Sequence, residues 1–159
     1  MDGSEIISSI KKSLPDFSAL LISQPYPDEI RIKVRHESFK DVCLVLHKIL
    51  PSPVMMLFAV DQRKLTDGAF AINAVFVNLR KSQWIIVQMD IPQANPCFDS
   101  LAKSIYSAAL FEREIYEMFG IAPKGNPDLR RLNLHDEVWP ENNFPLRKDF
   151  KEMAEGNLN

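Results

Sequence analysis

The stretch FEREIYEMFGIAPKGNPDLRRLNLHDEVWPENNFPLRKDF, residues 111–150, decides how this chain is organised. Its first nine residues predict a helix, which Gly120 ends as a C-terminal glycine cap. After Gly120 the prolines exclude a long helix or a central strand: Pro123, Pro127, Pro140 and Pro145. A run of about thirty residues with so little periodicity is usually functional or docks onto another surface.

Large apolar side chains are spread among the charges of this segment: Leu129, Leu132, Leu134, Val138, Trp139, Phe144, Leu146 and Phe150. A solvated linker does not need such residues, so another surface must cover them. We therefore divide the chain into an α+β domain, residues 1–120, and an extended docking segment, residues 121–159.

The helix before Gly120 carries a carboxylate on its apolar side. At about 100° per residue, Phe111, Ile115, Tyr116, Met118 and Phe119 share one arc, and Glu112 falls within it. Arg113, Glu114 and Glu117 fall on the other, solvated side. A buried carboxylate needs a partner, so we expect Glu112 to pair with an arginine of the segment: Arg130, Arg131 or Arg147. The alternative is a slightly rotated helix, with Glu112 in water.

Several short motifs in this region occur together in one protein family. They are Glu112-Arg113-Glu114, Met118-Phe119-Gly120-Ile121, Pro127-Asp128-Leu129-Arg130-Arg131 and Pro145-Leu146-Arg147-Lys148-Asp149. In order and spacing they resemble the thirty-kilodalton subunit of respiratory complex I, which is the C subunit of NADH–quinone oxidoreductase. The same domain occurs in membrane-bound NiFe hydrogenases and formate hydrogenlyases. The dense resemblance covers residues 100–150.

The chain departs from the family pattern at three places. Glu117 stands where the family usually has Asp, and Asn126 where it usually has His. The stretch from Trp139 to Phe144 replaces a short Gly-His and looks more like the hydrogenase branch. The branch, complex I or hydrogenase, therefore stays open.

The resemblance implies a non-catalytic scaffold subunit in the peripheral arm of such a complex. Its expected partners are the large subunit, which is NiFe-hydrogenase-like (the forty-nine-kilodalton type), and a neighbouring iron–sulfur subunit. We expect no cofactor, and a cytoplasmic location held at the inner membrane through the complex. The residues expected to form structural ion pairs and the partner interface are Glu112, Arg113, Glu114, Asp128, Arg130, Arg131, Trp139, Phe144, Arg147, Lys148 and Asp149.

Composition gives no case for a membrane span or a cofactor site. The most apolar region, residues 42–60, is interrupted by His47, Lys48, Pro51 and Pro53, and the N-terminus does not resemble a signal peptide. Cys43 and Cys97 lie far apart, which argues against a disulfide framework and for a reducing compartment. The three histidines are scattered, so iron–sulfur and zinc sites lack their closely spaced ligands.

The periodicity of residues 1–110 predicts a two-layer α+β domain, with helices on one face of a mixed, mostly antiparallel sheet of four to five strands. We expect helices over residues 4–14 and from Ser38 to Leu50, and a further helical start at Asp99 or Ser100. We expect strands near residues 20–23, 30–34, 54–60, 70–79 and 84–89, the last three as a meander. The run from Val54 to Val60 is nearly all apolar, as in a strand covered on both faces.

Two other function classes remain as alternatives. The first is a freestanding enzyme that uses Glu112, Glu114 or Glu117 as acid and base, although no nucleophile or oxyanion site accompanies them. The second is a nucleic-acid-binding module that uses Arg130, Arg131, Arg147 and Lys148. The net charge of −2, and eight acidic against six basic residues in 111–150, argue against that module.

Overall fold

A mixed five-stranded sheet forms the centre of the protein. The computed structural model describes residues 3–50, 52–65, 68–135 and 139–151. The strands are β1 (Leu21–Tyr26), β2 (Glu29–Lys33), β3 (Met56–Asp61), β4 (Ala69–Asn78) and β5 (Gln83–Pro92), in the spatial order β1-β2-β5-β4-β3. β3, β4 and β5 form the predicted antiparallel meander, whereas β2 lies parallel to β5.

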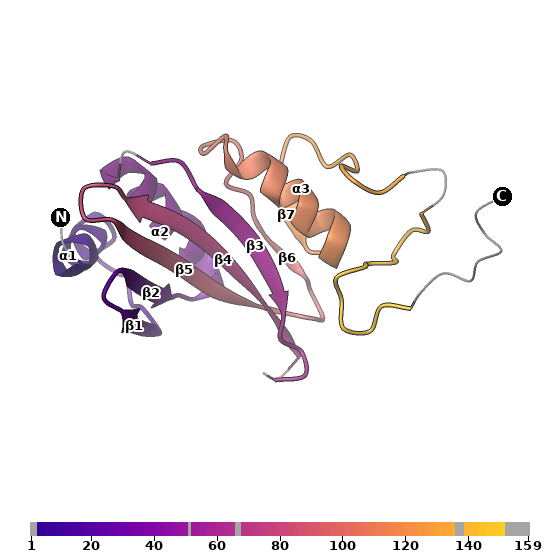
Figure 1. Cartoon of the computed structure of the whole chain (residues 1–159), viewed down its shortest axis with the longest axis horizontal. Helices are drawn as coiled ribbons and strands as arrows, with labels where there is room; N and C mark the ends of the chain where they lie inside the picture. The colour runs from indigo at the N-terminus through magenta and orange to yellow at the C-terminus, as the bar shows by residue number, and fades with distance from the viewer. Residues whose placement is uncertain (1–2, 51, 66–67, 136–138, 152–159) are drawn as a thin grey trace.

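The helices cover one face of this sheet. They are α1 (Gly3–Ser13), α2 (His36–Ile49) and α3 (Ala108–Phe119). In Figure 1, α1 and α2 lie behind the strands and α3 lies beside β3. On β4, Phe70, Ile72 and Phe76 are fully buried in a single core together with side chains of all three helices. The two-layer α+β class is therefore confirmed.

The opposite face of the sheet is only partly covered by the described residues, because Val75 is buried there but its neighbours on both sides are more open. Met56 and Trp84 keep 50% and 44% of their surface exposed there. The register places Met56 beside Val75 and Val75 beside Ile86, so an apolar row crosses three strands. The expectation that the strand from Val54 to Val60 is covered on both faces is wrong, because all three helices pack on the other side.

Two element starts also differ from expectation. α2 begins at His36 rather than Ser38, and its N-cap residue, Arg35, makes no side-chain capping hydrogen bond. Helical structure does not begin at Asp99 or Ser100. Asp99 instead ends a short strand, β6 (Cys97–Asp99), which pairs in parallel with β7 (Ala122–Lys124). Turns then carry the chain from β6 to α3.

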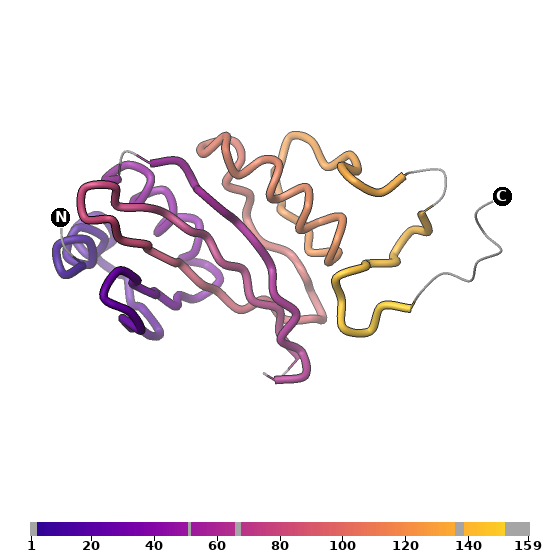
Figure 2. The backbone as a smooth tube through the Cα atoms, viewed as in Figure 1, coloured from indigo at the N-terminus to yellow at the C-terminus, as the bar shows by residue number. Residues whose placement is uncertain are grey.

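Gly120 ends α3 as predicted. Its φ of 65° is left-handed, and its N–H donates to the carbonyl of Tyr116. Beyond it the chain follows α3, and residues 139–151 then return toward the C-terminal end of the helix (Figure 2). At that end the N–H of Leu146 reaches the carbonyl of Met118. The division into domains 1–120 and 121–159 stays a prediction.

Replacing Gly120 with alanine is expected to lower the free energy of unfolding by about 2–3 kcal/mol. A Cβ there would overlap the ring of Phe144, in addition to the backbone strain of a positive φ. Gly125→Ala is the matched control, because Gly125 also has a positive φ but has open space around its Cβ position. Denaturant unfolding measures both variants. Equal losses would show that the Phe144 ring does not press on Gly120.

Candidate partner-docking site

Glu112 is fully buried, but no arginine of the described residues pairs with it. Its carboxylate accepts hydrogen bonds from the Ser100 hydroxyl at 2.6 Å, the Leu101 N–H at 2.6 Å and the Asn126 amide at 2.7 Å. The expected pairing with Arg130, Arg131 or Arg147 is wrong, and so is the alternative of a solvated side chain. Neutral donors from the turn after β6 and from the loop after β7 satisfy the carboxylate. Burial raises the pKa of Glu112 above its usual range, against the effect of these hydrogen bonds.

Glu117 is also buried, against the expectation of a solvated side. Its carboxylate accepts the backbone N–H groups of Leu132, Asn133 and Leu134 at 2.6–3.1 Å. A carboxylate that receives three backbone donors fixes the path of a chain segment. Glu117 therefore holds the docking segment against α3.

Arg113 also holds the segment against α3, but as a hydrogen-bond donor, whereas Glu117 is an acceptor. The guanidinium donates to the carbonyl of Arg130 and to that of Arg131, each at 2.9 Å, and lies 3.7 Å from the carboxylate of Asp128. Asp128 in turn pairs with Arg130 at 2.8 Å. The side chain and N–H of Arg130 hold the pKa of Asp128 well below its usual range. Arg113 and Glu117 thus bind the backbone of residues 130–134 from two positions on one helix.

Arg147 contacts the C-terminal end of α3 and does not contact Glu112. Its Nε donates to the carbonyl of Phe119 at 2.6 Å. Its guanidinium lies 4.3 Å from the ring centre of Phe144 and 5.3 Å from that of Phe70. Burial lowers the pKa of Arg147 below its usual range. The side chain therefore closes the C-terminal end of α3 over the core.

A second clamp binds the Pro-Leu-Arg-Lys-Asp motif to the end of β3. Arg63 pairs with Asp61 at 2.7 Å and with Asp149 at 2.6 Å, and the N–H of Lys148 donates to Asp61 at 2.8 Å. The carboxylate of Asp61 is 1% exposed, and the guanidinium of Arg63 holds its pKa well below the usual range. Sequence reasoning missed Asp61 and Arg63. Their one visible signal is two opposite charges, two residues apart, directly after an apolar strand.

Trp139 orders the segment from within. Its indole N–H donates to the carbonyl of Asn143 at 2.7 Å, and its ring stacks on Phe150 with centres 6.1 Å apart. Arg131 donates to the carbonyl of Trp139 at 2.8 Å. These contacts place Trp139 on the segment's own residues.

A cleft of about 400 Å³ remains between α3 and the segment. Its lining comes from Tyr116 and Glu117 on one side and from residues 129–131, 134 and 139–144 on the other. Arg130, Leu132 and Leu146 point outward beside these contacts, with 85% of the Arg130 side chain and 42% and 53% of the two leucines exposed. The structure thus brings most of the predicted site residues to one end of the molecule.

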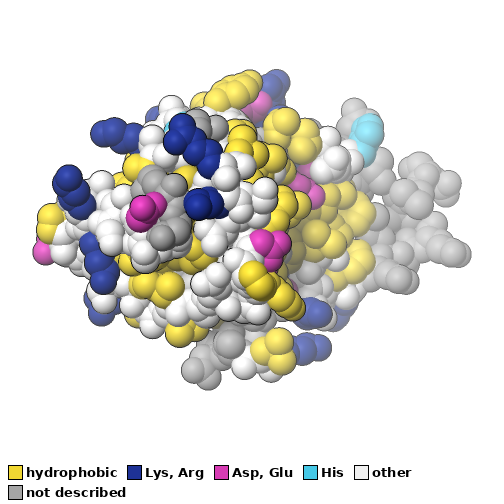
Figure 3. All heavy atoms as spheres, turned by 60° about the vertical axis from the view of Figure 1, so that its left-hand side comes forward, with side chains coloured by type: hydrophobic (Ala, Val, Ile, Leu, Met, Phe, Trp, Pro, Cys, Tyr) yellow, Lys and Arg dark blue, Asp and Glu magenta, His cyan; other side chains and the backbone are white. Residues whose placement is uncertain are grey.

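The arrangement does not form an acid–base pair. Glu112 and Glu117 are each saturated by donors, whereas Glu114 is exposed. Cys43 lies in the core, where burial raises the pKa of its thiol. Among the described residues, no three His, Cys, Asp or Glu side chains are placed to hold a metal ion. In Figure 3 basic side chains are dispersed among hydrophobic and acidic ones on the face shown.

Comparison with known proteins shows the family of this chain. The family model "Respiratory-chain NADH dehydrogenase, 30 Kd subunit" matches residues 32–155. Hydrogenase-4 component G of Escherichia coli (strain K12) is 31% identical over 92% of this chain and 26% of its own length. The C subunit of the F(420)H(2) dehydrogenase of Methanosarcina mazei is 29% identical over 95% of this chain and 93% of its own.

A solved structure supports the fold independently. One chain of the membrane-bound sulfane sulfur reductase, an archaeal respiratory membrane complex, superposes with a TM-score of 0.78 at 22% identity, over 94% of this chain and 85% of that one. By contrast, this chain spans only about a quarter of the length of several curated relatives, among them hydrogenase-4 component G. The family match covers most of the chain and includes both the Arg113–Glu117 contacts and the Asp61 clamp. The chain belongs to the family of the respiratory-chain NADH dehydrogenase 30 Kd subunit.

Proposed function

We propose that this protein is a scaffold subunit of a respiratory complex of the NADH–quinone oxidoreductase or membrane-bound hydrogenase type, without a catalytic site of its own. One observation carries the proposal. In several relatives named as components or subunits of such complexes, the matching region is about a fifth to a quarter of one longer chain. A domain that is covalently joined to a larger protein in its relatives must lie next to that protein. We propose that this chain has the same neighbour and contacts it through the docking segment.

The neighbour we propose is the large, NiFe-hydrogenase-like subunit of such a complex, with an iron–sulfur subunit beside it. The complex itself is attached to the cytoplasmic side of the inner membrane. None of the described helices is long and apolar enough to cross a bilayer. We propose that partner subunits attach the complex to the membrane. Both branches stay open, because relatives of both kinds match this chain.

The docking surface we propose is the outward side of residues 121–135 and 139–151. Some residues of this segment are held by the domain, and others are exposed. Asp149, Arg147 and the backbone of residues 130–134 are engaged by the domain and set the shape. Leu132 and Leu146 are exposed beside the cleft and are available as anchors. A segment already held in its bound shape loses little conformational entropy on docking, which favours affinity.

The test is a Leu132→Asp, Leu146→Asp double variant of the tagged chain. We expect the amount of large subunit that co-purifies with the tagged chain to fall at least about tenfold, because each substitution places a charge in an apolar contact. The melting temperature of the isolated chain should not change, because both leucines are exposed. Leu79→Asp is the matched control, since Leu79 is 71% exposed on the distant β4–β5 turn.

Two results would contradict the proposal. In the first, the double variant retains the large subunit at the level of the control, which would place the interface elsewhere. In the second, the wild-type chain purifies without any large subunit from cells that produce the whole complex. The second result would remove the scaffold role itself.

A further inference from the structure

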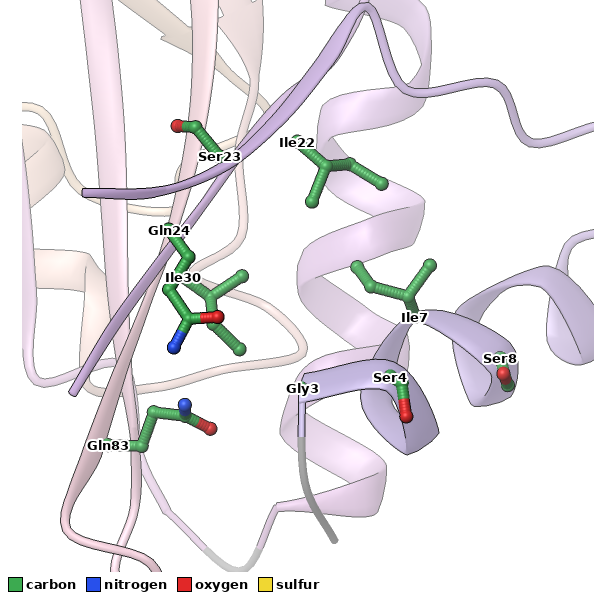
Figure 4. Close-up of a pocket in the computed structure, with 9 residues that line it drawn as sticks. All are labelled: Gly3, Ser4, Ile7, Ser8, Ile22, Ser23, Gln24, Ile30 and Gln83. Atoms are coloured by element: carbon green, nitrogen blue, oxygen red, sulfur yellow. The ribbon is translucent and has the colours of Figure 1, made fainter. Parts of the chain in front are cut away.

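A groove of about 730 Å³ lies at the opposite end of the molecule, between the start of α1 and strand β1. Figure 4 shows Ile7 and Ile22 facing each other across it, with Ile30 at its base and the polar side chains of Gln24 and Gln83 along one wall. Ser4, Ser8 and Ser23 complete its rim with Gly3. The described residues that line the groove carry no charged side chain, so their chemistry suits an uncharged occupant.

Strand β1 forms an open edge beside this groove. It pairs with β2 and is the last strand of the sheet among the described residues. Alternate backbone N–H and C=O groups of an edge strand point away from the sheet and can pair with another strand. Natural edges are usually protected by charges, yet β1 carries no charged side chain. Its large apolar side chains are exposed: Leu21 is 57% exposed, Ile22 44% and Tyr26 61%. Pro25 interrupts the edge only near its end.

Gln83 adds an unmet hydrogen bond on the wall of the groove. The residue is 9% exposed, and its Oε1 accepts no hydrogen bond from the described part of the chain. In Figure 4 its side chain points into the groove, toward Gly3. A buried acceptor without a donor costs free energy, which a donor on an occupant would recover.

We propose that an extended, uncharged segment of a partner protein binds in this groove and adds a strand to β1. Its backbone pairs with the free edge, and an apolar side chain enters between Ile7, Ile22 and Ile30. A long side chain of the same segment carries an N–H or O–H group across the groove and donates to Gln83 Oε1. A helix would leave the edge groups unpaired. A second copy of this chain would pair β1 with β1 and bring Pro25, which has no N–H, into that ladder. This surface is separate from the docking segment and stands or fails independently of the proposed function.

The experiment begins with a photo-cross-linking residue in place of Ser8, which is exposed and lines the groove. The full chain carries it in the native complex, and mass spectrometry maps the cross-linked residues. The mapped segment is then synthesised as a peptide and added to the isolated chain. We expect the peptide to bind and to slow amide hydrogen exchange in residues 21–24. Ser8→Arg should weaken binding at least about tenfold, because it places a charge in the uncharged groove.

Two further variants separate the contacts. Gln83→Met keeps the length of the side chain but removes the acceptor, and should lower the affinity for the peptide by about threefold to tenfold. Ser13→Arg is the matched control, because Ser13 is an exposed serine at the other end of α1 and does not line the groove. The proposal is overturned if no cross-link forms, if the cross-links join two copies of this chain, or if the peptide binds without protecting β1.

Discussion

Replacing Glu112 with alanine is expected to lower the free energy of unfolding by about 4 kcal/mol. The substitution leaves three donors without an acceptor in the interior: the Ser100 hydroxyl, the Leu101 N–H and the Asn126 amide. It also opens a cavity at a fully buried position. The donors come from the turn after β6 and from the loop after β7, so the loss separates both from α3. Thermal unfolding should show a decrease in melting temperature of about 10 °C or more.

Glu114→Ala is the matched control for this measurement. Glu114 lies two residues away on the same helix, but it is exposed, and removing an exposed carboxylate changes stability by less than about 0.5 kcal/mol. If both variants melt at the same temperature, Glu112 does not carry the buried hydrogen bonds.

The pH dependence of the same site has a definite sign. The pKa of Glu112 is raised by burial, so the folded chain holds this proton more tightly than the unfolded chain. Its contribution to stability is therefore largest below its unfolded pKa, about 4.5, and is lost as pH rises through the raised folded pKa. Glu112→Gln cannot titrate. The free energy of unfolding of the wild type minus that of Glu112→Gln should decrease from pH 4.5 to pH 7.5. A value that stays constant or increases over this range would refute the raised pKa.

Glu112 also shows how far the sequence carries a prediction. Helical periodicity places the carboxylate on the apolar side of α3, and the structure confirms its burial. The nature of its donors could not be inferred, because a backbone N–H such as that of Leu101 leaves no mark in composition. Asn126, the third donor, lies fourteen residues after Glu112 in an irregular loop, where no periodicity marks the contact.

Glu117 is a second residue whose surroundings could not be predicted from the sequence. Its place on the helix predicts a solvated carboxylate when α3 is considered alone. The segment after Gly120 then folds back over that side and brings the N–H groups of residues 132–134 to it. A contact between a helix and an irregular segment about fifteen residues later has no periodicity from which to predict it.

In the sheet, too, local contacts could be predicted and distant ones could not. The local meander of β3, β4 and β5 is readable from alternation and turns, whereas the parallel pairing of β2 with β5 joins strands about fifty residues apart. β6 and β7 are three residues long, too short for a repeating pattern. Local structure was therefore predictable, and long-range pairing was not.

The clamp on the Pro-Leu-Arg-Lys-Asp motif leads to the second large effect. Asp61→Ala is expected to lower the free energy of unfolding by about 3 kcal/mol. The variant removes the buried partner of Arg63 and leaves the Lys148 N–H without its acceptor. Because Arg63 keeps Asp149, the loss is at the low end for a buried ion pair. The pKa of Asp61 is depressed, so its contribution is present above about pH 3.8 and is lost as pH falls further.

Asp149→Ala is the control on the other side of Arg63. The Asp149 carboxylate is 63% exposed, and such pairs contribute less than about 1 kcal/mol. Amide hydrogen exchange then locates the effect. Asp61→Ala should speed exchange in residues 146–150 while α2 and β5 stay protected, and recovery of the large subunit should fall because the docking segment loses its shape. If Asp61→Ala melts normally and keeps its partner, the motif does not depend on this clamp. If it loses stability but keeps its partner, the segment covers its own domain, and the docking surface lies on another face.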